Sequence, residues 1–127
     1  TLYVAKNLRR GELFPARWSL DTEMKFHMLR RMLEWRAEID RDWSIRPGRL
    51  GRGLKRLLPA DLWSEIEQTF AGAGPDESWE ALWRTLSLFR RTAAEVGDAL
   101  GYAYPHDLDR RVTAYLISTQ PGDRDDV

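Results

Sequence analysis

The sequence predicts an all-α protein, a compact bundle of five or six helices. Apolar residues recur at spacings of three and four along most of the chain, and no segment alternates apolar and polar residues as a β-strand does. The 127 residues are enough for one domain that buries a core without disulfides, and the chain has no cysteine. We expect residues 1–119 to form this helical domain and residues 120–127, which are almost entirely polar, to be a disordered tail.

The clearest helix is predicted between Pro75 and Gly101. Proline suits the first helical position, and the carboxylates of Asp76 and Glu77 are stabilised by the positive end of the helix dipole. Glycine readily takes the left-handed conformation that ends a helix. The predicted buried stripe is formed by Trp79, Leu82, Trp83, Leu86, Phe89, Ala93, Val96 and Leu100.

The other segments should pack against this stripe. The spacing predicts helices over residues 2–13, ended by Pro15, and over residues 20–40, with Asp21 as N-cap. Further helices are predicted over residues 54–58, 59–70 and 105–119. Three methionines of the second helix share one face, which suits either an adaptable binding surface or ordinary core; we favour core for Met24, Met28 and Met32.

Residues 42–53 lack helical periodicity and combine proline and glycines with three arginines. Guanidinium groups bind phosphate oxygens in pairs, so Arg46, Arg49 and Arg52 are candidates for an anion site. The segment lacks the Gly-Lys-Ser or Gly-Lys-Thr end of a Walker loop. A solvated basic loop is the alternative interpretation.

Charge and composition exclude several classes of function. The chain has two histidines outside any metal-binding pattern and no cysteine, which argues against a zinc enzyme. The absence of a long apolar run or leader pattern favours a cytoplasmic protein that does not enter membranes. The net charge of zero hides an asymmetry, because residues 1–58 hold 14 basic and 7 acidic side chains while residues 59–127 hold 6 and 13. The acidic half argues against nucleic-acid binding, and the basic half suits an anion site or simply a solvated face.

Five pieces of the sequence, in order, resemble the C-terminal half of the aminoglycoside 6-adenylyltransferases, which modify streptomycin. They are YVAKNLRRGELFPAR-WSLD, LRRMLEW, SIRPGRLGRGLKRLLP, WEALWRTLSLFRRTAAEV and LGYAYPHDLDRRVTAYL. The resemblance implies a two-domain antibiotic-resistance enzyme that transfers AMP from ATP to a hydroxyl group of the drug. It also implies that the N-terminal nucleotidyltransferase domain, with its Gly-Ser turn and aspartates for Mg²⁺ and ATP, is absent from this chain. The chain alone is then expected to be inactive, with no catalytic residue and no metal ligand of its own.

The resemblance also suggests binding residues. Lys6 and Arg10 match cations of the family's opening helix, and Arg49 and Arg52 match the lysines of a Gly-Lys-x-Gly-Lys pattern, so these four are expected at the nucleotide phosphates. Glu12 and Asp21 match acidic positions that could face the guanidinium groups of streptomycin.

Each of these residues has a structural alternative. Asp21 could act only as an N-cap, Glu12 could pair with a neighbouring arginine, and the four cations could be solvated. For the whole chain, the alternative is a stand-alone helical interaction module without catalysis. A helical RNA-cleaving toxin needs an arginine four to six residues before a histidine, and neither His27 nor His106 has one.

Overall fold

The computed structural model describes residues 1–45 and 48–121, in which helices are joined by turns and short connections and no β-strand occurs. Six separate helices form the bundle, because α2 (Leu13–Trp18), η1 (Ser19–Leu29) and α3 (Arg30–Ile39) continue one another as a single rod. The others are α1 (Leu2–Arg9), α4 (Leu54–Leu57), α5 (Ala60–Gln68), α6 (Pro75–Leu100) and α7 (His106–Thr119), with a 3₁₀ turn, η2 (Arg49–Gly51), before α4. The predicted fold class is confirmed.

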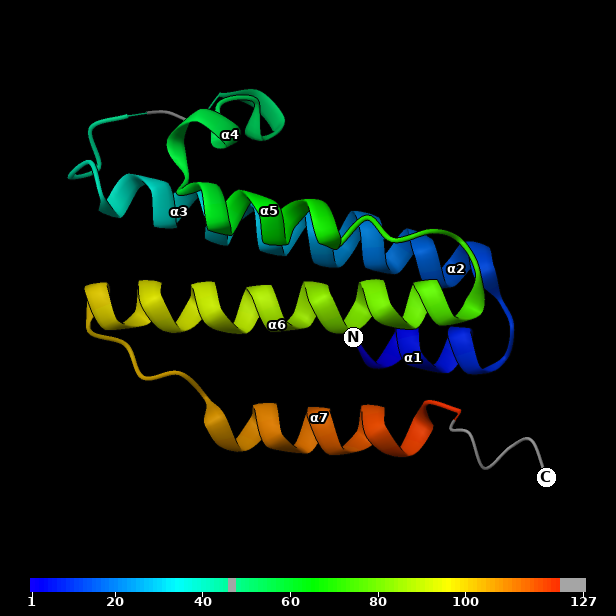
Figure 1. Cartoon of the computed structure of the whole chain (residues 1–127). Helices are drawn as coiled ribbons and strands as arrows, with labels where there is room; N and C mark the ends of the chain where they lie inside the picture. The colour runs from blue at the N-terminus through cyan, green and yellow to red at the C-terminus, as the bar shows by residue number, and fades with distance from the viewer. Residues whose placement is uncertain (46–47, 122–127) are drawn as a thin grey trace.

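Helix α6 is the central element, between the layer of α3 and α5 and the layer of α1 and α7 (Figure 1). It starts at Pro75 and ends at Gly101, whose φ of +81° is left-handed, as predicted. At that end the Tyr102 N–H donates to the Gly97 carbonyl at 2.8 Å, which turns the chain toward α7. Trp79 is fully buried, whereas Trp83 is partly buried and its indole N–H donates to Gln120 Oε1 at 2.7 Å. Leu100, the last residue of the predicted stripe, is exposed.

Two apolar clusters pack against successive stretches of α6. The first joins α1, α2 and α7 to the N-terminal half of α6 around Leu20, Trp79 and Leu82. The second joins α3, α4 and α5 to the next stretch around Leu33, Leu62 and Leu88. Together they fix both layers against the central helix.

The rod from Leu13 to Ile39 differs from its prediction in its middle. Residues Ser19–Leu29 are π-helical, with each bond spanning five residues instead of four. This widening places Leu20, Lys25 and Leu29 on the buried side. Of the three methionines predicted as core, Met24 and Met32 are partly buried and Met28 is 56% exposed. That prediction was wrong for Met28, because the pattern was interpreted with α-helical spacing.

The first turn of the chain also differs from its prediction. Helix α1 ends at Arg9, and the reversal occurs at Gly11, whose φ is +75°. Pro15 does not end a helix; it lies in the first turn of α2, where no backbone N–H is needed. The prediction of a disordered tail falls mostly on residues 122–127, outside the described residues, as does Arg46 of the basic loop.

Candidate functional site

A basic hollow lies where the end of α1 meets the end of α7. It is lined by Lys6, Arg9 and Arg10 from the first helix and by Tyr115, Ser118 and Thr119 from the last. The Arg9 guanidinium donates to the Thr119 carbonyl at 2.7 Å, which anchors one cation. Lys6 and Arg10 are exposed and make no ion pair with any other described residue. The hollow thus contains two side-chain cations without an ion-pair partner among the described residues, Lys6 and Arg10, beside the anchored guanidinium of Arg9. Three positive charges this close together could bind an anion.

The second predicted pair of cations lies elsewhere. Arg49 and Arg52 are exposed on the loop between α3 and α4. Leu50 between them has a left-handed backbone, and Gly51 lies against the side chains of Leu54 and Arg30. Figure 1 places this loop above the rod and α1 in the layer below it, on the other side of the bundle. The structure therefore brings Lys6 and Arg10 together and Arg49 and Arg52 near each other, as two separate groups.

The two predicted carboxylates have different surroundings. Glu12 is exposed at the start of α2, and no ion pair of its carboxylate is found among the described residues. Asp21 is only partly exposed and accepts from the Arg17 and Lys25 side chains, each at 3.1 Å. Asp21 lies inside the helical rod and is not an N-cap.

Asp21 belongs to a polar cluster that ties the rod to the segment before α6. Lys25 is 6% exposed; its ammonium group donates to the Thr69 carbonyl at 3.0 Å and lies 3.7 Å from the centre of the Phe70 ring. Burial lowers the pKa of Lys25, and the neighbouring Asp21 carboxylate opposes that shift. Arg17 adds hydrogen bonds to the backbone carbonyls of residues 71 and 72. The Asp21 carboxylate therefore holds a buried cation in place.

An aromatic and acidic hollow lies between α1 and the first part of the rod. Tyr3, Pro15, Trp18 and Glu23 line it, and the Trp18 side chain is 58% exposed. Glu23 is exposed and accepts from the Ser19 hydroxyl at 2.5 Å. An exposed indole and a neighbouring carboxylate can bind the same cation, the indole through a cation–π interaction and the carboxylate through a charge-assisted hydrogen bond. Sequence reasoning missed this hollow, since an aromatic residue in a helical segment suggests core by default.

A second charged cluster fixes the start of α7. The Asp109 carboxylate accepts from the Arg90 guanidinium at 2.5 and 2.6 Å and from the Tyr104 hydroxyl at 2.7 Å. The hydrogen bonds from Arg90 hold the pKa of Asp109 below its usual range, and burial raises the pKa of Tyr104. With all its partners within the chain, this cluster has a structural role.

Residues 1–45 and 48–121 contain no group of three histidine, aspartate or glutamate side chains that could hold a metal ion. Within the same ranges no helix is long and apolar enough to cross a membrane. For a charged ligand, the described surface offers two basic groups and one aromatic and acidic hollow.

Comparison with solved structures identifies the class of this helical bundle. It superimposes with a TM-score of 0.83 on the crystal structure of an aminoglycoside 6-adenyltransferase from Bacillus subtilis, at 30% sequence identity. The match covers 95% of this chain and 45% of that one.

Sequence comparison identifies the family. The model of the streptomycin adenylyltransferase family matches residues 1–119, and the chain belongs to this family. It is 32% identical over 113 residues to an aminoglycoside 6-adenylyltransferase of Bacillus subtilis (strain 168), across 89% of this chain and 39% of the relative. It is 28% identical over 117 residues to one from Campylobacter jejuni, across 92% of this chain and 40% of the relative. The chain thus spans about two fifths of the length of these curated relatives, and the predicted resemblance to this family is confirmed.

Proposed function

We propose that this chain is the C-terminal helical part of an aminoglycoside adenylyltransferase that transfers AMP from ATP to a hydroxyl group of streptomycin and thereby confers resistance. The observation that carries the proposal is the family match over residues 1–119 of a chain that spans only two fifths of its relatives. Because the described residues hold no metal-binding cluster, the Mg²⁺ that accompanies ATP would be held mainly by a preceding nucleotidyltransferase domain. The helical part alone would not transfer AMP.

The helical part would contribute cations to the nucleotide. When the drug hydroxyl attacks the α-phosphorus, pyrophosphate leaves with additional negative charge, and lysine and arginine side chains stabilise such charge. Lys6 and Arg10 are the better candidates, because they share one hollow and are not paired with described carboxylates. Arg49 and Arg52 are the second candidates, on a separate loop.

Kinetics of the intact enzyme can separate the two basic groups. We expect Lys6→Ala to lower kcat/KM for ATP by about tenfold or more, since about 1.4 kcal/mol corresponds to one decade. Arg52→Ala tests the loop in the same way, and Arg111→Ala, an exposed arginine of α7, is the matched control. If neither test variant differs from the control while all remain folded, the proposed phosphate contacts are wrong.

The drug would lie on the acidic side of α1 and α2. Streptomycin carries two guanidinium groups, for which the exposed Glu12, the aromatic and acidic hollow with Trp18 and Glu23, and the remaining lone pairs of Asp21 are suitable partners. Glu12→Gln and Glu23→Gln should raise KM for streptomycin and leave the ATP dependence unchanged. Glu67→Gln, an exposed glutamate of α5, is the control. An unchanged streptomycin KM in both variants would exclude this surface.

A further inference from the structure

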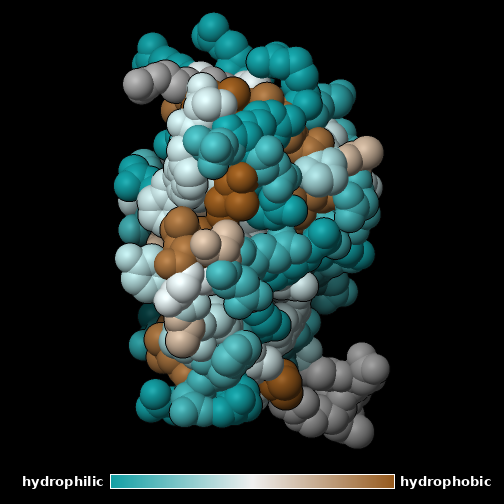
Figure 2. All heavy atoms as spheres, turned by 90° about the vertical axis from the view of Figure 1, so that its left-hand side faces the viewer, coloured by the Kyte–Doolittle hydropathy of each residue, from teal (hydrophilic) through white to brown (hydrophobic). Residues whose placement is uncertain are grey.

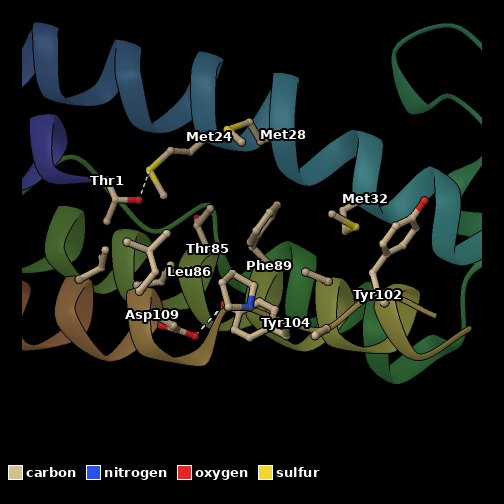
Figure 3. A pocket seen from close by; sticks show the side chains of 16 residues that line it. Thr1, Met24, Met28, Met32, Thr85, Leu86, Phe89, Tyr102, Tyr104 and Asp109 are labelled. Atoms are coloured by element: carbon tan, nitrogen blue, oxygen red, sulfur yellow. Dashed lines mark hydrogen bonds between the residues drawn. The ribbon is translucent and has the colours of Figure 1, made fainter. Parts of the chain in front are cut away.

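A largely apolar cavity of about 450 Å³ lies between the rod, α6 and α7. Phe89 and Ala93 of α6 line its floor, Met24, Met28 and Met32 point into it from the rod, and Tyr104 lies on the side of α7 (Figure 3). Small-molecule sites in proteins usually measure about 300–1,000 Å³, with mainly apolar and aromatic walls and a few polar groups. This cavity has the size and the lining of such a site.

The cavity reaches the surface through apolar residues. Met28 is 56%, Leu108 52% and Tyr102 73% exposed, and all three belong to its lining. In the view from the end where α6 terminates, apolar residues reach the surface in several groups between hydrophilic ones (Figure 2). The exposed rim gives a ligand access to the cavity from solvent.

Helix α6 buries three hydroxyl groups at intervals of seven residues, Ser78, Thr85 and Thr92, each 0% exposed. The Ser78 hydroxyl donates to the Ala73 carbonyl at 3.4 Å. The Thr92 hydroxyl donates to the Leu88 carbonyl at 2.7 Å. Thr85 lines the cavity, and its Oγ1 has no hydrogen-bond partner among the described residues. A buried hydroxyl without a partner destabilises a fold, so a partner supplied by a ligand would explain this one.

The charges around the cavity favour a neutral ligand. Asp109 is the one acidic or basic side chain among the described residues of the lining. Its carboxylate already accepts from Arg90, Tyr104 and Thr113. A charged ligand would therefore lose its hydration to apolar walls without gaining an ion-pair partner, which is costly.

The side chains of the lining favour an aromatic ring. All three methionines of the protein lie on this one cavity, and methionine sulfur makes favourable contacts with ring edges. Phe89 and Tyr104 add aromatic surface against which a further ring can pack. Neighbouring side chains shield Thr85 Oγ1 from solvent, so a ligand reaches this oxygen when a flexible methionine side chain moves aside. Figure 3 shows Thr85 below Met24.

We propose that this cavity binds a neutral aromatic molecule whose one polar group forms a hydrogen bond with Thr85 Oγ1. The hydroxyl can donate to a carbonyl or accept from an N–H or O–H group, which allows either kind of substituent. The cavity shares no lining residue with the basic hollow or with the aromatic and acidic hollow. The site therefore goes beyond the proposed function, and its test requires no adenylyl transfer.

A matched pair of probes tests the proposal on the 127-residue chain. Indole and indene have closely similar bicyclic rings, but only indole carries an N–H group that can donate to Thr85. NMR of isotope-labelled methionine methyl groups follows binding, because Met24, Met28 and Met32 all line the cavity. The methyl signals of Ile117, which is exposed but does not line the cavity, are the internal control. We expect saturable shifts of the three methionine signals with each probe.

The variant Thr85→Val removes the hydroxyl and should leave the fold intact, because that group has no partner to lose. We expect it to weaken indole binding about fivefold, the contribution of one neutral hydrogen bond, and to leave indene binding unchanged. Thr92→Val is the matched control, since Thr92 is equally buried on the same helix but does not line the cavity. It should change the affinity for neither probe.

This pattern, with the Ile117 signals unchanged, supports the proposal. Equal indole affinity in Thr85→Val and the unchanged protein would overturn the hydrogen bond on which recognition depends. Methionine signals that do not shift, or that shift together with those of Ile117, would show that neither probe occupies the cavity and would overturn it as well. Stronger shifts with ATP than with indole would assign the cavity to a charged nucleotide. Methionine signals that move with protein concentration alone would assign it to a second copy of the chain, and either result would overturn the proposal.

Discussion

Replacing Asp21 by asparagine tests whether this carboxylate stabilises the fold or serves the drug. The substitution removes the negative charge 3.1 Å from the Lys25 ammonium while preserving the size of the side chain. Lys25 is 6% exposed and would keep only the Thr69 carbonyl and the face of Phe70. Breaking a fully buried ion pair costs about 3–5 kcal/mol, and the partial exposure of Asp21 reduces this, so we expect a loss of about 1.5–3 kcal/mol.

The stability lost in Asp21→Asn has an upper bound and depends on pH. Lys25 can escape an unpaired buried charge by releasing its proton, which at pH 7 costs about 4.6 kcal/mol from an ordinary lysine pKa of about 10.4. Burial already lowers the pKa of Lys25, and losing the carboxylate lowers it further. The unfolded state then binds more protons than the folded state, so the stability of Asp21→Asn should rise relative to the unchanged protein as the pH rises toward the ordinary lysine pKa of about 10.4.

Urea unfolding followed by tryptophan fluorescence measures this effect. Asp98→Asn, an exposed carboxylate of α6, is the matched control, and the double variant with Lys25→Met should recover part of the lost stability. A change within about 0.5 kcal/mol for Asp21→Asn, the range of ordinary surface substitutions, would refute the structural role. Asp21 would then be available to a ligand. If the loss is as large as expected, a kinetic defect of this variant cannot be attributed to drug contact.

Two further predictions concern the core and acid stability. Trp79→Ala should lower the free energy of unfolding by about 3–5 kcal/mol, because Trp79 is 3% exposed within the first apolar cluster; a loss below about 1 kcal/mol in urea would contradict the described packing. Asp109→Asn should cost about 1–3 kcal/mol at neutral pH through its hydrogen bonds to Arg90 and Tyr104. Because the pKa of Asp109 is lowered in the fold, this contribution is complete above the ordinary carboxyl pKa of about 3.9 and lost as the pH falls below it. Acid titration of stability should therefore be shallower in the Asn variant, and an equal slope would exclude this role.

The central helix could be predicted closely because its signals are local. Pro75 and Gly101 act through their own backbone restrictions, and both ends of α6 lie where the sequence indicates. The position of Met28 could not be predicted in the same way. Its exposure depends on the π-helical bonds of residues 19–29, which have no recognisable pattern in the sequence.

The sequence predicts the residue types of the candidate site better than it predicts their arrangement in space. Lys6 and Arg10 were selected from the sequence and do share a hollow, but their separation from Arg49 and Arg52 is set by the packing of the bundle. The surroundings of the Asp21 and Lys25 pair are equally nonlocal, since Lys25 donates to the carbonyl of Thr69, 44 residues away in the sequence. Spacing within one helix could suggest the pair of Asp21 and Lys25 but could not show that it is buried.

We propose that this chain supplies the helical part, and not the transferase chemistry, of an aminoglycoside adenylyltransferase. The most direct measurement is mass spectrometry of streptomycin after incubation with ATP and Mg²⁺. One sample contains the purified 127-residue chain; the other contains the Bacillus subtilis relative in which the 113 matched residues are replaced by this chain. We predict no change with the chain alone and a mass gain of one adenylyl group with the chimera. Adenylyl-streptomycin formed by the chain alone, or a folded chimera that forms none, would contradict the account.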